Sequence, residues 1–221
     1  MRLYHHPFSS SARRAVMAAL YMDTDVELVL AKDLRESEQR LELLRLNPNG
    51  KIPVLQDGDF VLWESYAIMQ YLADKTPGQT LYPTNIKARA DVNRWMYWCA
   101  QHWTPAIGVL AAENSMKQLF GHGTLPDRHE VRRGETELAK VARVLDVHLR
   151  GREWLCKSGL SLADFAIAVT LAAQEPARLP LLQYGNLQVW FGRVQSLDVW
   201  KQTKFESGGR PVVAGAAAAR M

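Results

Sequence analysis

Short strand-like runs alternate with amphipathic helical stretches through the first third of the chain. The strand-like runs are residues 2–6, 26–30, 52–56 and 60–63. The helical stretches, in which apolar residues recur every three or four positions, are residues 11–22, 37–46 and 65–74. The pair Asp57-Gly58 between the last two strand-like runs predicts a tight β-hairpin turn. The predicted order of elements is therefore β-α-β-α-β-β-α.

The pattern changes after residues 76–85, a proline-containing polar stretch that is typical of an interdomain linker. Beyond it every pattern is helical, over residues 86–116, 130–149, 161–173 and 187–194. Pro105 predicts a kink in the first of these helices. The predicted organisation is an α/β domain at 1–78, a linker at 79–86, an all-helical domain at 87–207 and a tail at 208–221. We expect a flexible tail, because it has too few large apolar side chains to pack.

Composition and charge argue against several classes of function. The 221 residues carry a formal net charge of only +4, spread along the chain, whereas a nucleic-acid-binding protein usually clusters its basic residues. Cys99 and Cys156 are far apart and no CxxC pair occurs, which disfavours a dithiol redox motif and a cysteine-rich zinc site. The first residues lack a continuous apolar run, so we expect no signal peptide, and no stretch approaches the length of a membrane span. We therefore expect a cytoplasmic protein with no metal, nucleic acid or membrane partner.

Three consecutive serines precede the first predicted helix, in the segment HHPFSSSARRAV. A serine hydroxyl just before a helix caps it by accepting a backbone N–H, so Ser9, Ser10 and Ser11 are redundant candidates for the cap. A hydroxyl at this place can also donate a hydrogen bond to a bound group. The segment alone leaves both interpretations open.

The segment NPNGKIPVL places Pro53 at the start of a predicted strand. A cis Ile52-Pro53 bond would turn the backbone N–H and C=O of Ile52 out of the sheet ladder, where they can pair with an extended peptide. Only about 5–6% of such bonds are cis in folded proteins, so an ordinary edge-strand start is the alternative.

In the segment WESYAI, Glu64 and Ser65 lie between a strand and a helix. Capping of the helix explains Ser65 without any ligand. The unpaired N–H groups of a helix start also suit a carboxylate, and an acid beside them suits an amine. Together these groups predict a site for an α-amino-acid head group.

The segment SLADFAIA in the helical half has the spacing of a capping box. Ser161 and Asp164 are three residues apart, and Leu160 and Phe165 can form the hydrophobic staple around them. We interpret this motif as structural and expect no catalytic role for it.

The serine loop, NPNGKIPVL, ESYAI and SLADFAIA occur in an order and at a spacing that resemble the cytosolic glutathione transferase superfamily. The resemblance covers almost the whole chain up to the tail. It implies a thioredoxin-like α/β N-terminal domain, an all-α C-terminal domain and glutathione as co-substrate.

The resemblance also implies which residues bind glutathione. Ile52, beside a cis Pro53, would pair its backbone with the cysteinyl unit. Glu64 and Ser65 would hold the γ-glutamyl end. Lys51 would lie near the glycyl carboxylate or the strand edge. Family members often add a His or Gln from the region of the second helix, and the candidates for that role here are Arg35, Gln39 and Arg40.

In this family the thiol of glutathione must ionise, because the thiolate is the nucleophile. The family's serine-type members use a hydroxyl between the first strand and the first helix as a hydrogen-bond donor to the sulfur. The motif matches Ser9, with Ser10 as the alternative and Ser11 as the expected helix cap. Tyr4 lies one position from the tyrosine of tyrosine-type members, and we expect it in the core or behind the residues that contact the ligand. The subclass implied is serine-type and theta- or zeta-like.

The family's second substrate is a small hydrophobic electrophile, and the aromatic candidates for contacting it are Phe8, Trp98, His102 and Trp103. For any one of them, a place in the domain core is the alternative. The implied activity is glutathione conjugation of the kind used in detoxification, by a homodimer. Two alternatives are a glutathione-dependent isomerase of the maleylacetoacetate type and a non-catalytic, transferase-like regulator that binds a protein. The full zeta pattern SSCxW is absent, which disfavours the isomerase.

Overall fold

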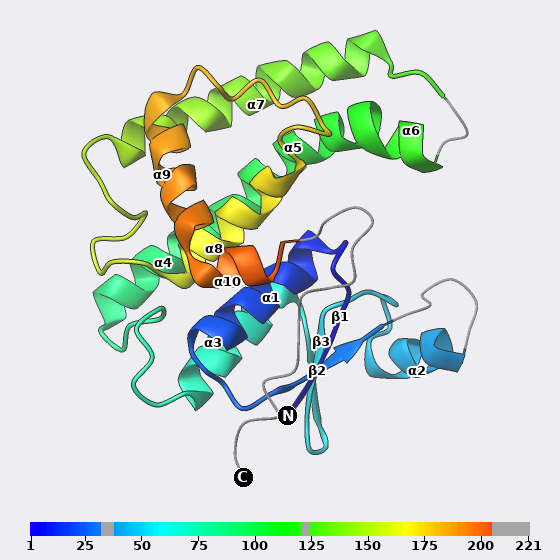
Figure 1. Ribbon diagram of the computed structural model, residues 1–221, viewed down its shortest axis with the longest axis vertical. Helices are drawn as coiled ribbons and strands as arrows, with labels where there is room; N and C mark the ends of the chain where they lie inside the picture. The colour runs from blue at the N-terminus through cyan, green and yellow to red at the C-terminus, as the bar shows by residue number, and fades with distance from the viewer. Residues whose placement is uncertain (32–37, 121–123, 205–221) are drawn as a thin grey trace. The chain divides into compact units, whose positions relative to one another are not determined.

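The computed structural model describes residues 1–31, 38–120 and 124–204, drawn in colour in Figure 1. The chain divides into two compact units. The first consists of Met1–Gln79 together with the segment that begins at Gln195, and the second is Thr80–Val194. The tail predicted at 208–221 lies outside the described residues.

The first unit is built on a four-stranded mixed sheet with the strand order β2-β1-β3-β4. Its strands are β1 (Arg2–His5), β2 (Glu27–Leu30), β3 (Val54–Asp57) and β4 (Phe60–Trp63), and its helices in chain order are α1 (Ser10–Tyr21), α2 (Glu38–Leu46) and α3 (Ser65–Lys75). β1 runs parallel to β2 and antiparallel to β3, which forms a hairpin with β4. This confirms the predicted order β-α-β-α-β-β-α.

The two faces of the sheet are covered by different helices (Figure 1). Tyr4 and Val54 are paired across β1 and β3, and they form one core cluster with Leu43 of α2. Leu3 and Leu55, also paired, point to the opposite face because side chains alternate along a strand. That face is covered by α1 and α3. Tyr4 is 8% exposed, so its predicted place in the core is confirmed.

The second unit is helical. Its elements are α4 (Ile86–Trp98), the π-helical turn η1 (Cys99–Trp103), α5 (Thr104–Ala111), the π-helical turn η2 (Ala112–Met116), α6 (Lys117–Phe120), α7 (Arg128–Leu149), α8 (Leu162–Ala168), the 3-10 turn η3 (Val169–Ala173) and α9 (Gly185–Ser196). The predicted helix over 86–116 is helical throughout, and the π-helical turn η1 lies just ahead of Pro105. Among the helices that the structure describes, none is long and apolar enough to cross a membrane.

A short helix that the sequence pattern did not predict follows α9. This helix, α10 (Asp198–Gln202), belongs with the first unit and packs against α1. The chain therefore returns to the α/β unit after it has completed the helical one.

A buried carboxylate accepts hydrogen bonds from several segments of the helical unit. Asp164 accepts hydrogen bonds from the backbone N–H and hydroxyl of Ser161, both at 2.9 Å. It also accepts one from the backbone N–H of Leu155 at 3.0 Å and one from the indole N–H of Trp190 at 2.8 Å. Asp164 is fully buried, and the predicted capping box is confirmed. Burial raises the pKa of Asp164, and the four hydrogen bonds oppose this rise.

Candidate glutathione site

The register of the sheet brings three of the sequence motifs to one edge of the first unit. Tyr4 of β1 is paired with Val54 of β3, and Val54 is paired with Trp63 of β4. The serine loop follows β1, the Ile52-Pro53 segment precedes β3, and Glu64 follows β4. All three segments therefore leave the sheet at the same edge, although they are distant in sequence.

The first segment is the serine loop, and the structure places the helix cap at Ser9. Ser9 has an extended backbone, with φ −90° and ψ 109°, and its Oγ accepts the backbone N–H of Ala12 at 3.1 Å. The helix begins at Ser10. The prediction that Ser11 is the cap is therefore wrong. A turn explains the shift, because the N–H of Ser9 bonds the carbonyl of His6 at 3.0 Å and ends the preceding segment there.

Capping leaves the Ser9 hydroxyl able to donate. A hydroxyl has one proton and two lone pairs, and the bond from Ala12 uses only a lone pair. Ser9 is partly buried, whereas Ser10 is exposed and is the first residue within the helix. The Ser9 proton thus lies at the positive end of the α1 dipole, in an orientation limited by the capping bond.

The second segment is the loop before β3. The Ile52-Pro53 peptide bond is cis, and Ile52 lies outside the strand, which starts at Val54. The loop is organised by Asn47, which is 3% exposed. Its amide donates to the carbonyl of Lys51 at 2.7 Å, and its side-chain oxygen accepts the backbone N–H of Asn49 at 3.0 Å. The Lys51 side chain is exposed.

Asn47 lies within the motif NPNGKIPVL, but the sequence pattern alone assigns it no role. Its position before a proline-glycine turn is the signal for such a loop-bracing amide. Of the second-helix candidates, Arg40 donates to the carbonyl of Gly50 at 3.4 Å. Arg35 and the side chain of Gln39 lie outside the described residues.

The third segment is the turn into α3. Glu64 has φ +73° and ψ 112°, a backbone conformation that costs energy for a residue with a side chain. It is exposed and makes no side-chain capping bond. The carbonyl of Glu64 accepts the N–H of Ile68 at 3.0 Å, so the N–H groups between them precede the first intrahelical bond. Ser65, the first residue of this helix, is 5% exposed.

The fixed positive charge of this unit includes two buried arginines on α1. Arg13 is 8% exposed and Arg14 is 2% exposed. Burial lowers the pKa of Arg13 to about 10, so it is still charged at neutral pH. The histidines beside the serine loop add little charge, because burial lowers the pKa of both His5 and His6 below the ordinary value. The sequence pattern assigns no role to either arginine.

The aromatic candidates for the electrophile fall into two groups. In the first unit, Phe8 is 74% exposed and stacks on His6 with ring centroids 5.3 Å apart. In the second unit, His102 is exposed and Trp98 is half-buried. Trp103 is fully buried, donates its indole N–H to Thr170 at 2.8 Å and stacks on Trp98 at 5.9 Å. Trp103 thus supports Trp98 from the core.

Comparison with known proteins agrees with this architecture. Residues 1–74 match the glutathione S-transferase N-terminal domain, and residues 112–198 match the glutathione S-transferase C-terminal domain. Glutathione S-transferase F10 from Arabidopsis thaliana is 30% identical over 213 residues, which cover 89% of this chain and 93% of that protein. The chain therefore belongs to the glutathione S-transferase family and is a transferase enzyme that uses glutathione.

Solved structures give the same result for the fold. A glutathione S-transferase from Rhodospirillum rubrum F11 has a TM-score of 0.79 and 25% identity, covering 93% of this chain and 92% of its own. A delta-class glutathione transferase from Nilaparvata lugens has a TM-score of 0.74 and 32% identity, covering 88% of each chain. The predicted fold class, a thioredoxin-like domain followed by a helical one, is confirmed.

Proposed function

We propose that this protein is a serine-type glutathione transferase, with a theta- or zeta-like serine loop, that conjugates glutathione to a small hydrophobic electrophile. The observation that carries the proposal is the hydrogen bonding of the Ser9 hydroxyl. Its Oγ accepts the N–H of Ala12 and so retains a proton for donation, at the start of α1. The proposal needs no histidine or aspartate partner, because the serine donates a hydrogen bond and does not attack.

Around this serine we assign the binding of glutathione to the three segments at the sheet edge. Ile52, preceding Pro53, pairs its backbone with the cysteinyl unit. Glu64 binds the γ-glutamyl ammonium, and Ser65 with the N–H groups of the first turn of α3 binds its carboxylate. The φ of +73° at Glu64 supports this role, since backbone strain of this kind is retained where it serves binding. Lys51 is assigned to the glycyl carboxylate.

The chemical task is to keep the thiol ionised at neutral pH. A free thiol has a pKa of about 8.5, so only a few per cent is thiolate at pH 7. Lowering the pKa by about two units requires about 2.7 kcal/mol of preferential stabilisation of the anion. The Ser9 hydrogen bond and the N-terminus of α1 both act in this direction. The thiol proton leaves to solvent, the sulfur lone pair forms the bond to the electrophilic carbon, and the leaving group departs with its electron pair.

The electrophile side of the proposal rests on the exposed aromatic groups. Phe8 offers an apolar ring close to the serine loop, and Trp98 and His102 are the candidates on the helical unit. A cytoplasmic homodimer acting in detoxification completes the proposal. Light scattering tests the assembly, since a monomeric mass contradicts the dimer.

The thiol pKa of bound glutathione tests the assignment of Ser9. We expect Ser9→Ala to raise that pKa, measured by thiolate absorbance across a pH titration, and to slow conjugation of chlorodinitrobenzene while glutathione binding persists. Ser10→Ala is the matched control and is expected to leave both nearly unchanged. An effect of Ser10→Ala alone would show that the serine assignment is wrong. Glutathione binding without conjugation of any electrophile would contradict the proposed reaction.

A further inference from the structure

The α10 segment contacts α1 through the side chain of Arg13. The guanidinium of Arg13 donates from Nη2 to the carbonyl of Trp200 at 3.0 Å and from Nε to the hydroxyl of Thr203 at 3.2 Å. It also lies over the Trp200 ring, with Cζ 3.9 Å from the ring centroid. Two directed hydrogen bonds and a stacking contact hold this group in one geometry.

The same residue belongs to the turn that carries the proposed thiol donor. The backbone N–H of Arg13 bonds the carbonyl of Ser9 at 2.8 Å, which closes the first turn of α1. A helical side chain leans toward the N-terminus of its helix, over the preceding turn. Arg13 therefore connects α10 directly to the turn that begins at Ser9.

The charge of Arg13 is not compensated by any acid that the structure describes. Its two hydrogen-bond acceptors are a carbonyl and a hydroxyl, both neutral, and no described carboxylate lies within ion-pair distance. The charged groups on α10 are Asp198 and Lys201, which are exposed and paired with each other at 3.3 Å. A buried cation that lacks a counter-ion among the described residues favours an anion nearby.

Arg14, the next residue, provides a comparison within the same helix. Its guanidinium lies over the Tyr66 ring of α3 at 4.5 Å, and its buried Nε has no hydrogen-bond partner among the described residues. Arg14 thus faces α3, whereas Arg13 faces α10 and donates two hydrogen bonds to it. Of these two arginines, Arg13 is the one whose guanidinium contacts the described C-terminal segment.

We propose that Arg13 is a positioning residue of the thiol site, held by Trp200 and Thr203, which fixes the first turn of α1 and adds a positive charge that favours a thiolate beside Ser9. This inference rests on the proposed function, because it needs glutathione to bind with its sulfur at that turn. It assigns the α10 segment a part in activating the thiol. The segment therefore acts from the end of the chain on a residue near its beginning.

Titration of bound glutathione by thiolate absorbance separates this role from a purely structural one. We expect Arg13→Met to raise the thiol pKa by about one unit, which from a parent value near 6.5 means about threefold less thiolate at pH 7. Arg13→Lys keeps the positive charge, so the thiol pKa in this variant should lie close to the parent value. Thr203→Val is expected to give a smaller rise in the same direction, and Thr203→Ser should restore the parent value. Lys201→Ala, an exposed change on the same helix, is the matched control and should leave the titration unchanged.

Urea unfolding of each variant identifies the structural alternative. If Arg13→Met does not fold, Thr203→Val and Arg13→Lys carry the test. A loss of stability with an unchanged thiol pKa in the folded protein would overturn the proposal. That result differs from failure of the proposed function, in which Ser9→Ala leaves the thiol pKa unchanged or the parent does not bind glutathione.

Discussion

Two pairs of an acid and a serine lie at helix starts in this protein, and their acids differ in burial and in hydrogen bonding. Ser161 and Asp164 open α8 and are fully buried, and the Asp164 carboxylate accepts four hydrogen bonds. Glu64 and Ser65 open α3. Glu64 is exposed in a strained backbone conformation and makes no capping bond.

The difference teaches how to separate a folding motif from a binding motif when both have the same residue types. In the first pair the carboxylate is fully buried and its four hydrogen bonds all come from within the protein, so the motif stabilises the fold. In the second pair the Glu64 side chain makes no capping bond and keeps its hydrogen-bonding capacity, and the backbone strain works against stability. Unused capacity and local strain together indicate a site for a ligand.

Removal of the buried acid should produce the largest effect on stability. Asp164→Asn places an NH₂ group among four donors, so buried donors lose their acceptor, and we expect a loss of about 3 kcal/mol in the free energy of unfolding. Ser161→Ala removes only part of the network and should cost about 1 kcal/mol. Urea denaturation measures both. A loss below that of Ser161→Ala would show that Asp164 is not the hub of the helical unit.

Replacement of the exposed acid should have a smaller effect on stability, of the opposite sign. Glu64→Gly relieves the positive φ and should raise the free energy of unfolding by about 1 kcal/mol or less. It should weaken glutathione binding about tenfold or more, because a charged hydrogen-bond partner is lost.

Glu64→Gln is the matched control, since it keeps the strain and removes only the charge. It should weaken binding, measured by calorimetry, without the gain in stability. If both variants bind glutathione as tightly as the parent does, the interpretation of Glu64 and Ser65 as a binding motif is wrong.

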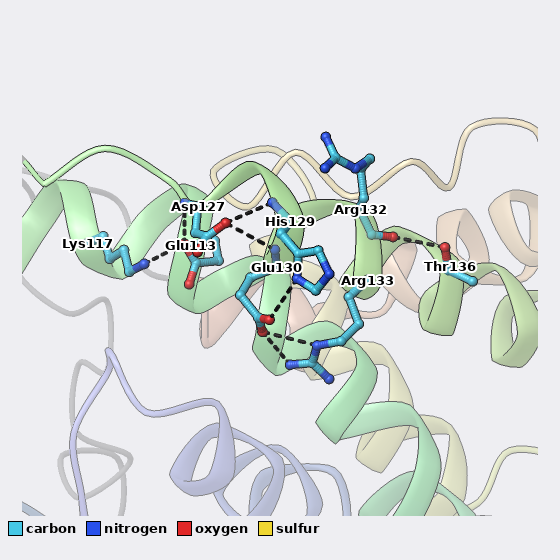
Figure 2. A network of polar contacts seen from close by, with 8 residues as sticks. All are labelled: Glu113, Lys117, Asp127, His129, Glu130, Arg132, Arg133 and Thr136. Carbon is cyan, nitrogen blue, oxygen red and sulfur yellow. Dashed lines mark hydrogen bonds and ion pairs between the residues drawn. The ribbon is translucent and has the colours of Figure 1, made fainter.

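A third acid makes fewer hydrogen bonds than Asp164 and more than Glu64. Its replacement should give the smallest change in the free energy of unfolding. Glu113 of η2 pairs with Lys117 at 2.6 Å and accepts the backbone N–H of Asp127, the cap of α7, at 2.8 Å (Figure 2). These contacts, Lys117 foremost, hold the pKa of Glu113 below its ordinary value of 4.5.

The lowered pKa gives the direction of the pH dependence. The ionised carboxylate stabilises the folded state above pH 4.5, and this contribution is lost as the pH falls through the lowered pKa of the folded protein. Glu113→Gln should therefore be slightly less stable than the parent at pH 7, and the difference should shrink in acid. A difference that is constant between pH 7 and pH 3 would contradict the ionic role.

Much of the fold could be predicted from the order of local patterns. The strand and helix periods, the Asp57-Gly58 turn and the spacing of Ser161 and Asp164 each depend on neighbours in sequence, and the structure confirms them. The residues that leave the sheet at one edge could also be found within their motifs. That these segments lie together depends on the register of the strands, which cannot be predicted from local patterns.

The errors and omissions share a cause. Ser11 was predicted as the cap, but three identical serines offer equal local chemistry, and the turn from His6 to Ser9 selected the register. Trp103 was a candidate for the electrophile, yet it is fully buried against Thr170. An aromatic residue on an amphipathic helix does not reveal by sequence whether its neighbours cover it.

The sequence by itself determined the two kinds of domain, the family and the short segments that carry the proposed chemistry, because these follow from local spacing and residue type. Only the tertiary structure decided that Ser9 caps α1, that Glu64 adopts a positive φ, and that Arg13 is buried against Trp200. The physical reason is the same in each case. Hydrogen bonding and burial depend on atoms that folding brings together across the sheet edge or from opposite ends of the chain.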